Sequence, residues 1–98
     1  MLAQASPASK AQGLAELYGE TLGAAAECPT VTPARIDALT TKASARIKLV
    51  AADAADATTA GGVLVDFVAR GRAEVQSGEE TCPQAESEFS QLERELTR

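Results

Sequence analysis

The sequence predicts an all-α fold: an up-down antiparallel four-helix bundle stapled by one disulfide. Three observations lead to this prediction. Apolar residues recur at steps of three and four positions in four separate stretches, as on one face of a helix, and no stretch alternates as a strand does. Prolines and helix-capping residues separate these stretches. Alanine, the strongest helix former, is abundant, and aromatic residues are only 3% of the chain, so the core must be thin and aliphatic.

The first helix is expected over about residues 7–27. Pro7 suits a first-turn position, where its missing N–H would have no partner in any case. Ser9 and Gln12 have the spacing of a capping box. Pro29 ends the helix, because the residue before a proline is disfavoured in helical geometry.

The second helix is expected over about residues 33–52. Thr32 is placed to cap it, and Pro33 occupies the first helical position. The pattern does not fix its end, since the alanine-rich stretch 51–57 is compatible with a continuing helix or with a tight bend.

The third and fourth helices are expected over about 59–76 and 83–97. Gly71 lies on the apolar stripe of the third helix, where a missing side chain lets a neighbouring helix approach closely. Thr81 and Gln84 have capping-box spacing at the start of the fourth helix. Because the connections are short, successive helices are expected to be antiparallel neighbours.

The stretch 1–5 carries the small residues Ala3 and Ala5 in the A-x-A pattern that precedes signal-peptide cleavage. We interpret it as the remainder of a secretory signal, followed by a single helical domain over 6–98. An ordinary alanine-rich N-terminus is the alternative. The alanine content is also what a GC-rich bacterial genome would produce.

The two cysteines, Cys28 and Cys82, lie at the end of the first expected helix and at the start of the fourth. These positions share one pole of an antiparallel bundle, so a disulfide is the favoured interpretation, and it indicates a periplasmic or secreted bacterial protein. A redox-active pair usually has C-x-x-C spacing, and a metal site would need more soft ligands in a chain that has no histidine. Two free buried thiols of a cytosolic protein are the remaining alternative.

The net charge of −5 is unevenly distributed, with +1 over residues 1–48 and −6 over residues 49–98. An acidic chain without a basic patch repels a phosphate backbone, so nucleic-acid binding is disfavoured. No apolar run approaches the roughly 18–20 residues that span a bilayer, so membrane insertion is not expected. The sequence contains no cofactor-binding motif, and no cofactor is expected.

One basic stripe is a candidate binding site. Arg35, Lys42 and Arg46 share one side of the second helix, beside its buried face. Their functional interpretation is contact with an anionic ligand or a partner. The alternative is a solvated edge that faces the acidic fourth helix.

A cavity between the helices is a second candidate, because the core is rich in small residues. The residues predicted to line it are Tyr18, Phe67, Gly71 and Phe89, with Gly61 and Gly62 as further candidates. Close packing of the alanines is the simpler alternative.

Acidic residues near two helix starts are expected to be structural. Asp53 and Asp56, with two threonines after them, offer oxygen ligands to a hard cation but do not match the calcium-loop pattern, so no metal site is predicted. Glu79 and Glu80 are expected to stabilise the positive end of the fourth helix dipole.

Catalysis has little support, and no enzyme activity is expected. Histidine is absent, which excludes histidine-based triads, and neither a P-loop nor a nucleophile-elbow motif is present. The expected function is therefore that of a small exported interaction module that binds an unidentified protein partner in the periplasm. Formation of a homo-oligomer is compatible with this expectation.

Two other functions remain open at this stage. In size, helix content and one long-range disulfide between Cys28 and Cys82, the chain resembles the HdeA-type acid chaperones of the bacterial periplasm. The resemblance implies partial unfolding at low pH with exposure of an apolar, client-binding surface. Protonation of the fourteen carboxylates would take the net charge from −5 to about +9, which favours loosening. The other alternative is a carrier of a small apolar ligand held between the helices.

Overall fold

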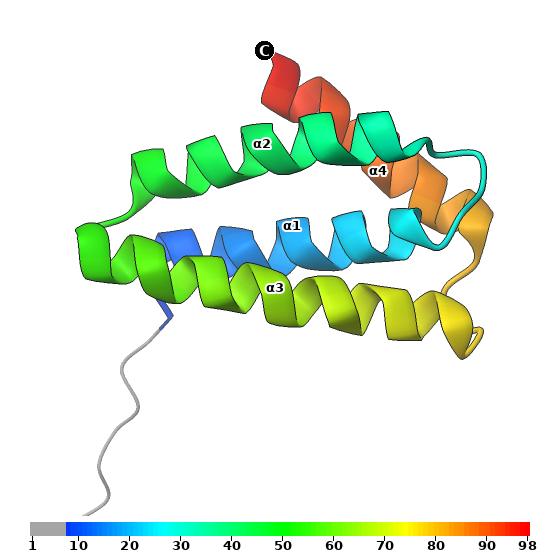
Figure 1. Cartoon of the computed structure of the whole chain (residues 1–98), viewed down its shortest axis with the longest axis horizontal. Helices are drawn as coiled ribbons and strands as arrows, with labels where there is room; N and C mark the ends of the chain where they lie inside the picture. Colours follow the sequence, from blue (N-terminus) through cyan, green and yellow to red (C-terminus); the bar gives the residue numbers. More distant parts are fainter. Residues whose placement is uncertain (1–7) are drawn as a thin grey trace, which may run out of the picture.

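Four helices form the structure, a computed structural model that describes residues 8–98. They are α1 (Lys10–Ala26), α2 (Pro33–Val50), α3 (Ala54–Gln76) and α4 (Cys82–Thr97), and the described residues contain no strand. Successive helices run in opposite directions, as Figure 1 shows. The predicted all-α, up-down antiparallel bundle is therefore confirmed. Within the described residues, no helix has both the length and the apolar character needed to cross a membrane.

Helix α1 begins three positions later than the predicted start at residue 7. Ser9 is its N-cap, and the hydroxyl oxygen of Ser9 accepts a hydrogen bond from the backbone N–H of Gln12 at 3.1 Å. The Gln12 side chain does not return to the cap, as a capping box requires, but donates to Asp56 of α3 at 3.3 Å. Pro7 and the signal-like stretch 1–5 lie outside the described residues.

The boundary between α2 and α3 was left open by the sequence, and the structure places a bend there. Helix α2 ends at Val50, two residues before the predicted end, and α3 starts at Ala54 rather than residue 59. Asp53 causes the early start, because its carboxylate accepts the backbone N–H of Asp56 at 2.8 Å as an N-cap. The bend therefore comes before most of the alanine-rich stretch.

Helix α4 starts with the predicted capping box. The Thr81 hydroxyl accepts the backbone N–H of Gln84, and the Gln84 side chain accepts the backbone N–H of Thr81 at 3.0 Å. Cys82 is the first residue of the helix. The preceding turn uses Gly78, whose φ of 83° lies in the left-handed region that favours glycine.

The closest helix pair is α1 with α3, which run in the same direction (Figure 1). Glycines make this approach possible: a β-carbon at Gly23 would stand 1.9 Å from the Val68 carbonyl oxygen, and one at Gly71 would stand 2.1 Å from that of Glu20. At these points the backbone of α1 packs directly against the backbone of α3. In a square up-down bundle the first and third helices are diagonal, whereas here they form the central contact.

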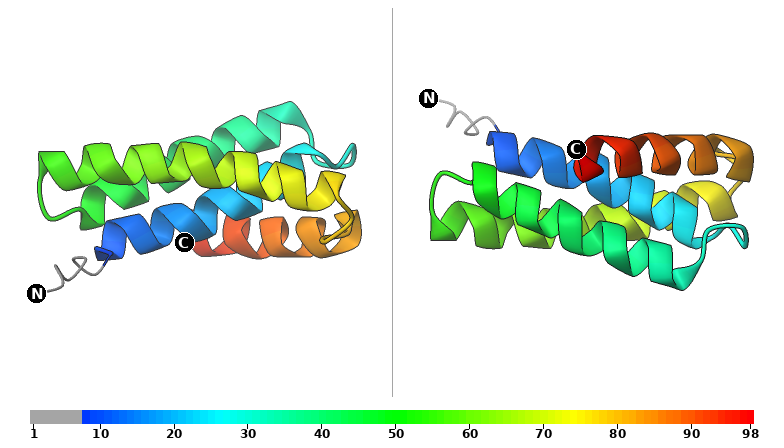
Figure 2. Two further views of the ribbon diagram at one scale, coloured as in Figure 1. Left: turned by 90° about the horizontal axis from the view of Figure 1, so that it is seen from below. Right: turned by 90° about the horizontal axis from the view of Figure 1, so that it is seen from above.

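The core lies along this helix pair and under α2 and α4. In the view from above, α1 runs between α2 and α4 (Figure 2). The main cluster of buried side chains is aliphatic apart from Tyr18 and Phe89. The Cα atoms span 47 × 32 × 16 Å, so the bundle is flat. A groove lies between α2 and α4 on this flat bundle.

The disulfide between Cys28 and Cys82 is present. Their Cα atoms are 5.6 Å apart, within the ordinary range for a disulfide. The bridge connects the end of α1 to the first turn of α4, and a small buried cluster with Ala24 and Ala85 surrounds it. Formation of a disulfide fits an oxidising compartment.

Candidate functional site

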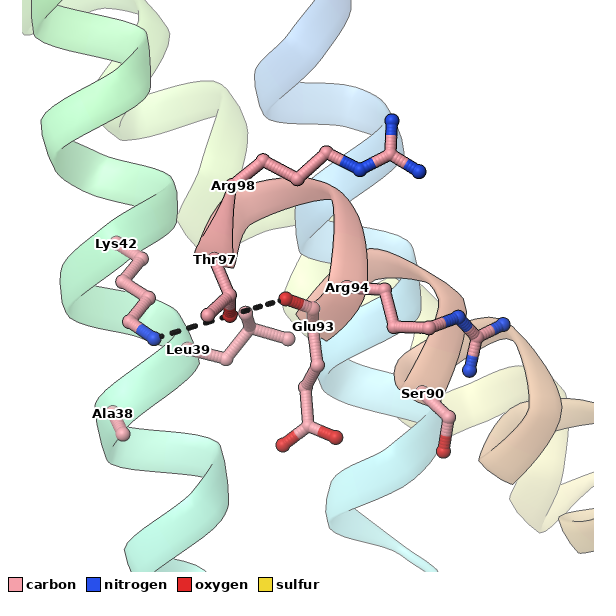
Figure 3. Close-up of a pocket in the computed structure, with 8 residues that line it drawn as sticks. All are labelled: Ala38, Leu39, Lys42, Ser90, Glu93, Arg94, Thr97 and Arg98. Carbon is pink, nitrogen blue, oxygen red and sulfur yellow. Dashed lines mark hydrogen bonds between the residues drawn. The ribbon is translucent and has the colours of Figure 1, made fainter.

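A groove with a volume of about 630 Å³ lies between α2 and the C-terminal half of α4. Figure 3 shows it from outside, with Leu39 of α2 facing α4 across its floor. The lining residues are Ala38, Leu39, Lys42, Ser90, Glu93, Arg94, Thr97 and Arg98.

The groove continues along α2 into a second hollow of about 380 Å³, which shares Lys42 with the first. Its apolar wall includes Leu49, a large hydrophobic side chain that is 79% exposed. Monomeric proteins scatter single exposed leucines over their surface, but this one lines a hollow together with Ala45 and Leu96. We call the two hollows together the α2/α4 groove; the second hollow adds Ala45, Arg46, Leu49 and Leu96 to the residues given above.

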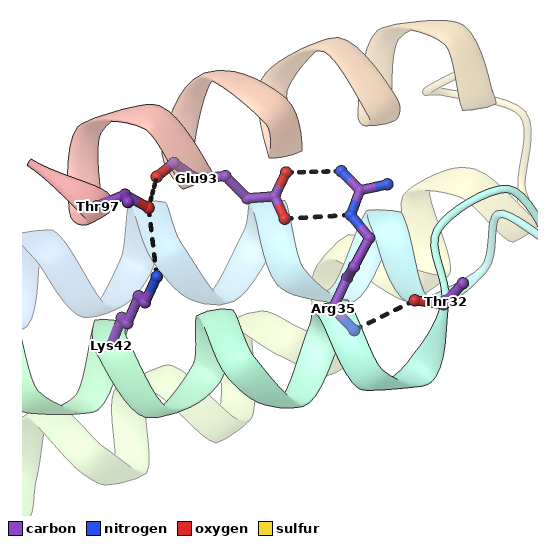
Figure 4. Close-up of polar contacts among 5 residues, drawn as sticks. All are labelled: Thr32, Arg35, Lys42, Glu93 and Thr97. Carbon is purple, nitrogen blue, oxygen red and sulfur yellow. Dashed lines mark hydrogen bonds and ion pairs between the residues drawn. The ribbon is translucent and has the colours of Figure 1, made fainter.

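An ion pair fixes α2 against α4 at one end of the groove. The guanidinium of Arg35 donates two hydrogen bonds to the Glu93 carboxylate, from Nη2 to Oε1 at 2.6 Å and from Nε to Oε2 at 3.1 Å (Figure 4). The same guanidinium lies 5.2 Å from the centroid of the Phe89 ring. Hydrogen bonding to Arg35 lowers the pKa of Glu93. Glu93, the groove's acidic residue, is thereby neutralised.

The groove is rimmed by positive charge. Of nine basic residues in the chain, four line it: Lys42, Arg46, Arg94 and Arg98. Lys42 reaches across to the Thr97 hydroxyl, with Nζ–Oγ1 at 3.3 Å, while the side chains of Arg94 and Arg98 extend away from α2 at the outer edge (Figure 3). Among the described residues, the ion pairs are formed by Arg35 and Arg72, and none of these four residues takes part in one.

The predicted basic stripe therefore divides between two roles. Arg35 faces the acidic fourth helix and is engaged by Glu93, whereas Lys42 and Arg46 line the groove. Arg94 and Arg98 were not among the predicted site residues, and the expectation that the chain has no basic patch is wrong for this face. The signal was their spacing of four, which puts both on one side of α4.

The residues predicted to line an internal cavity are packed instead. Tyr18 and Phe89 belong to the buried core, and α1 backbone atoms fill the space beside Gly71. Burial raises the pKa of the Tyr18 hydroxyl, and the charge of nearby Arg46 opposes that rise. Phe67 is half-buried on α3, 5.4 Å from the Arg70 guanidinium. Added β-carbons at Gly61 and Gly62 would meet nothing within 4 Å, so neither glycine borders an enclosed space.

The carboxylates of Asp53 and Asp56 both accept hydrogen bonds from backbone N–H groups. Asp53 caps α3, and the Asp56 carboxylate accepts hydrogen bonds from the Ala52 N–H at 2.9 Å and from the Ser9 hydroxyl at 2.7 Å. These bonds, together with that from Gln12, lower the pKa of Asp56. Asp56 thereby joins the start of α1 to the start of α3. No group of three or more potential metal ligands comes together within residues 8–98.

The expectation for Glu80 at the start of α4 is not met. Its carboxyl lies near those of Glu88, Glu74 and Glu20, and burial together with these like charges raises its pKa to about 7. The side-chain contact with Glu20, together with burial, likewise raises the pKa of Glu74. Burial and the neighbouring carboxyl groups therefore disfavour the ionised form of Glu80, which is the form that the dipole expectation requires.

The chain was compared with known proteins at three levels. It matches no protein-family model, no curated protein and no solved structure. Its function must therefore be argued from its own residues.

Proposed function

We propose that this protein is an exported interaction module without catalytic activity, which binds a protein partner in the bacterial periplasm or outside the cell. The observation that carries the proposal is the α2/α4 groove, which combines an apolar floor with a basic rim. Apolar surface bordered by polar residues is typical of protein-binding sites. The disulfide supports the oxidising compartment.

The rigidity of the frame also supports a binding role. The Cys28–Cys82 bridge ties α4 to α1, and the Arg35–Glu93 pair ties α4 to α2. A surface that is already held in its binding shape loses less conformational entropy when a partner docks.

Site-specific photo-crosslinking tests the proposal in the native cell. A crosslinking amino acid is placed at Ala38 or Ala45, both exposed in the groove, and at Ala69 or Ala73 as matched controls on the exposed face of α3. We expect discrete crosslinked products at the groove positions alone. No product at any position, or equal products at all four, would contradict a partner in the groove.

An acid-activated chaperone is the second candidate, and one specific observation favours it. Three interhelical contacts depend on ionised carboxylates: Asp56 with Ser9, Glu93 with Arg35 and Glu27 with Arg72. The pKa of each of these carboxyl groups is lower in the folded protein than its ordinary value. Each ionised group therefore stabilises the fold at pH values above its ordinary pKa, and this stabilisation is lost as the pH falls through the lowered pKa.

The chaperone candidate is tested by client aggregation at pH 2–3 with and without the protein. Suppression at pH 2–3 that is absent at pH 7 is the expected result. If a client aggregates equally with and without the protein at low pH, this second function is wrong.

A further inference from the structure

The length of the α2/α4 groove fits a short helix. Its residues on α2 run from Ala38 to Leu49, eleven steps of about 1.5 Å, or about 17 Å in all. This is the length of about three helical turns. The α2 residues of the groove recur at steps of three and four, so they form one straight stripe, which lies beside α4 as far as Lys42 and extends past the end of α4 from Ala45 to Leu49.

Apolar residues occur along this whole length, among the polar and charged residues that make up six of the eight lining the first hollow. Its apolar residues are Ala38, Leu39, Ala45, Leu49 and Leu96. Ala38 and Ala45 are small and exposed, which leaves room for the larger side chains of a partner beside the exposed Leu49. An amphipathic helix would present such side chains at positions i, i+3 or i+4, and i+7.

The charged residues of the groove indicate the charge of the partner. Four cations line the groove, and the single anion, Glu93, is occupied by Arg35. The chain as a whole has a net charge of −5, so this face is opposite in sign to the rest of the molecule. A partner with acidic flanks would be attracted to this face and repelled elsewhere.

The groove is too open to enclose a small molecule. Binding sites for small ligands bury most of the ligand surface, whereas Ala38, Ala45 and Leu49 are all exposed along this one. A helix, in contrast, needs to bury only one face.

We infer that the α2/α4 groove binds an acidic amphipathic helix of about three turns, contributed by the partner protein. The apolar face of that helix lies on Ala38, Ala45, Leu49 and Leu96, and its carboxylates pair with Lys42, Arg46 and Arg94 on the rim. This inference rests on the proposed function and adds the chemical class of the partner.

Three synthetic helical peptides with a neutral fluorophore serve as probes in fluorescence anisotropy. The first carries three leucines on one face and glutamates on the flanks. The second replaces the glutamates by lysines, and the third replaces the leucines by serines. We expect the first peptide alone to bind, with an affinity that falls as salt is raised from 50 to 500 mM. Equal binding of the lysine or serine peptide would overturn the inference.

Variants of the protein test whether the acidic peptide binds in the α2/α4 groove. Lys42→Glu with Arg94→Glu is expected to weaken binding of the acidic peptide by about tenfold or more. The matched control, Lys10→Glu with Arg70→Glu, makes the same charge change outside the groove and is expected to leave affinity within about twofold. Leu49→Ala is also expected to weaken binding; because the Leu49 side chain is exposed, the variant is expected to keep its fold, which circular dichroism checks. Equal losses in the groove and control variants would overturn the inference.

Other occupants of the groove give distinct results. A concentration-dependent dimer that the Lys42→Glu, Arg94→Glu variant abolishes would assign the groove to a second copy of this chain. Binding to phosphatidylglycerol vesicles that the same variant abolishes, without binding of the acidic peptide, would assign it to a membrane surface. If the peptide fails but groove crosslinks to a protein are found, the helix inference alone is wrong; if both fail, the proposed function fails too.

Discussion

The backbone of Gly71 in α3 lies against that of Glu20 in α1, so close that a β-carbon at position 71 would stand 2.1 Å from the Glu20 carbonyl oxygen. No flexible side chain is available there to move aside, since the obstacle is the backbone of another helix. The approach of α1 to α3, and hence the flat shape of the bundle, therefore depends on glycine at a few positions.

Gly71→Ala is expected to lower the free energy of unfolding by about 3 kcal/mol or more, because the two helices must separate to admit the methyl group. Gly23→Ala should act in the same way, given its 1.9 Å clash with Val68. Urea denaturation measures both.

Gly61 and Gly62 provide the matched control for those substitutions. Both lie inside α3 with open space around them, so alanine there removes a flexible residue without a clash. We expect each Gly→Ala change to stabilise the protein by about 0.5–1 kcal/mol. Equal effects of alanine at positions 61 and 71 would show that α1 and α3 are not packed as described.

The disulfide is expected to supply a large part of the stability. Closing a loop with a sequence separation of 54 is worth about 4 kcal/mol in the chain-entropy account. The variant with both Cys28→Ala and Cys82→Ala should therefore unfold at a much lower urea concentration than the oxidised protein. A reductant should lower the midpoint of the wild type to that of the variant and leave the variant unchanged; a wild type that does not respond would show that the bridge contributes little.

The Arg35–Glu93 pair is expected to contribute modestly, because both side chains are partly exposed, at 42% and 31%. A double-mutant cycle with Arg35→Ala and Glu93→Ala should give a small favourable coupling energy at low salt that decreases as salt is added. Arg35→Lys should recover only part of it, since lysine cannot make the two-point contact. A coupling energy of zero at low salt would show that this ion pair does not hold α2 against α4.

Stability is expected to reach a maximum near pH 5. The pKa of Glu80 is raised to about 7, so the stability linked to its protonation is fully present below its usual pKa of 4.5 and is lost as the pH rises through 7. The pKa values of Asp56, Glu27 and Glu93 are lowered, and the stability linked to their ionisation disappears as the pH falls below about 4. Thermal melts from pH 3 to pH 9 measure this profile.

Glu80→Gln isolates the high-pH side of the profile. The substitution is expected to stabilise the protein by about 1 kcal/mol at pH 8 and to have little effect at pH 4.5. Glu79→Gln, which removes the same charge from an exposed neighbour, should have the same small effect at both values. If both variants behave alike, the group of glutamates around Glu80 does not govern the pH dependence.

Local signals predicted most of the fold. Thr32, Thr81 and Ser9 cap the helices at which the pattern placed them, because a cap depends only on residues within one turn. The predicted start of α3 at residue 59 was wrong. Asp53 caps the helix, but the alanines that follow it show no apolar periodicity from which a helix could be predicted. The disulfide followed from helix order alone.

The candidate site was less predictable, because it depends on how helices pair. Arg94 and Arg98 join Lys42 only because α4 lies beside α2, a relation that no single stretch of sequence encodes. The same holds for Gly19 and Gly23 of α1, which are four residues apart and both buried against α3, yet were not distinguished from other small residues. For Glu80, a local dipole argument failed because its neighbours in space come from three different helices.

The Cys28–Cys82 bridge also makes a covalent ring of the chain between these residues, and the ring contains α2, α3 and the bend at Ala51–Asp53. A protease that cuts once in that bend would open the ring without releasing a fragment. The nicked molecule would run as two pieces on a gel only after reduction, and its refolding would remain a unimolecular reaction, independent of protein concentration. The bridge thus keeps the two pieces together after a cut at this bend.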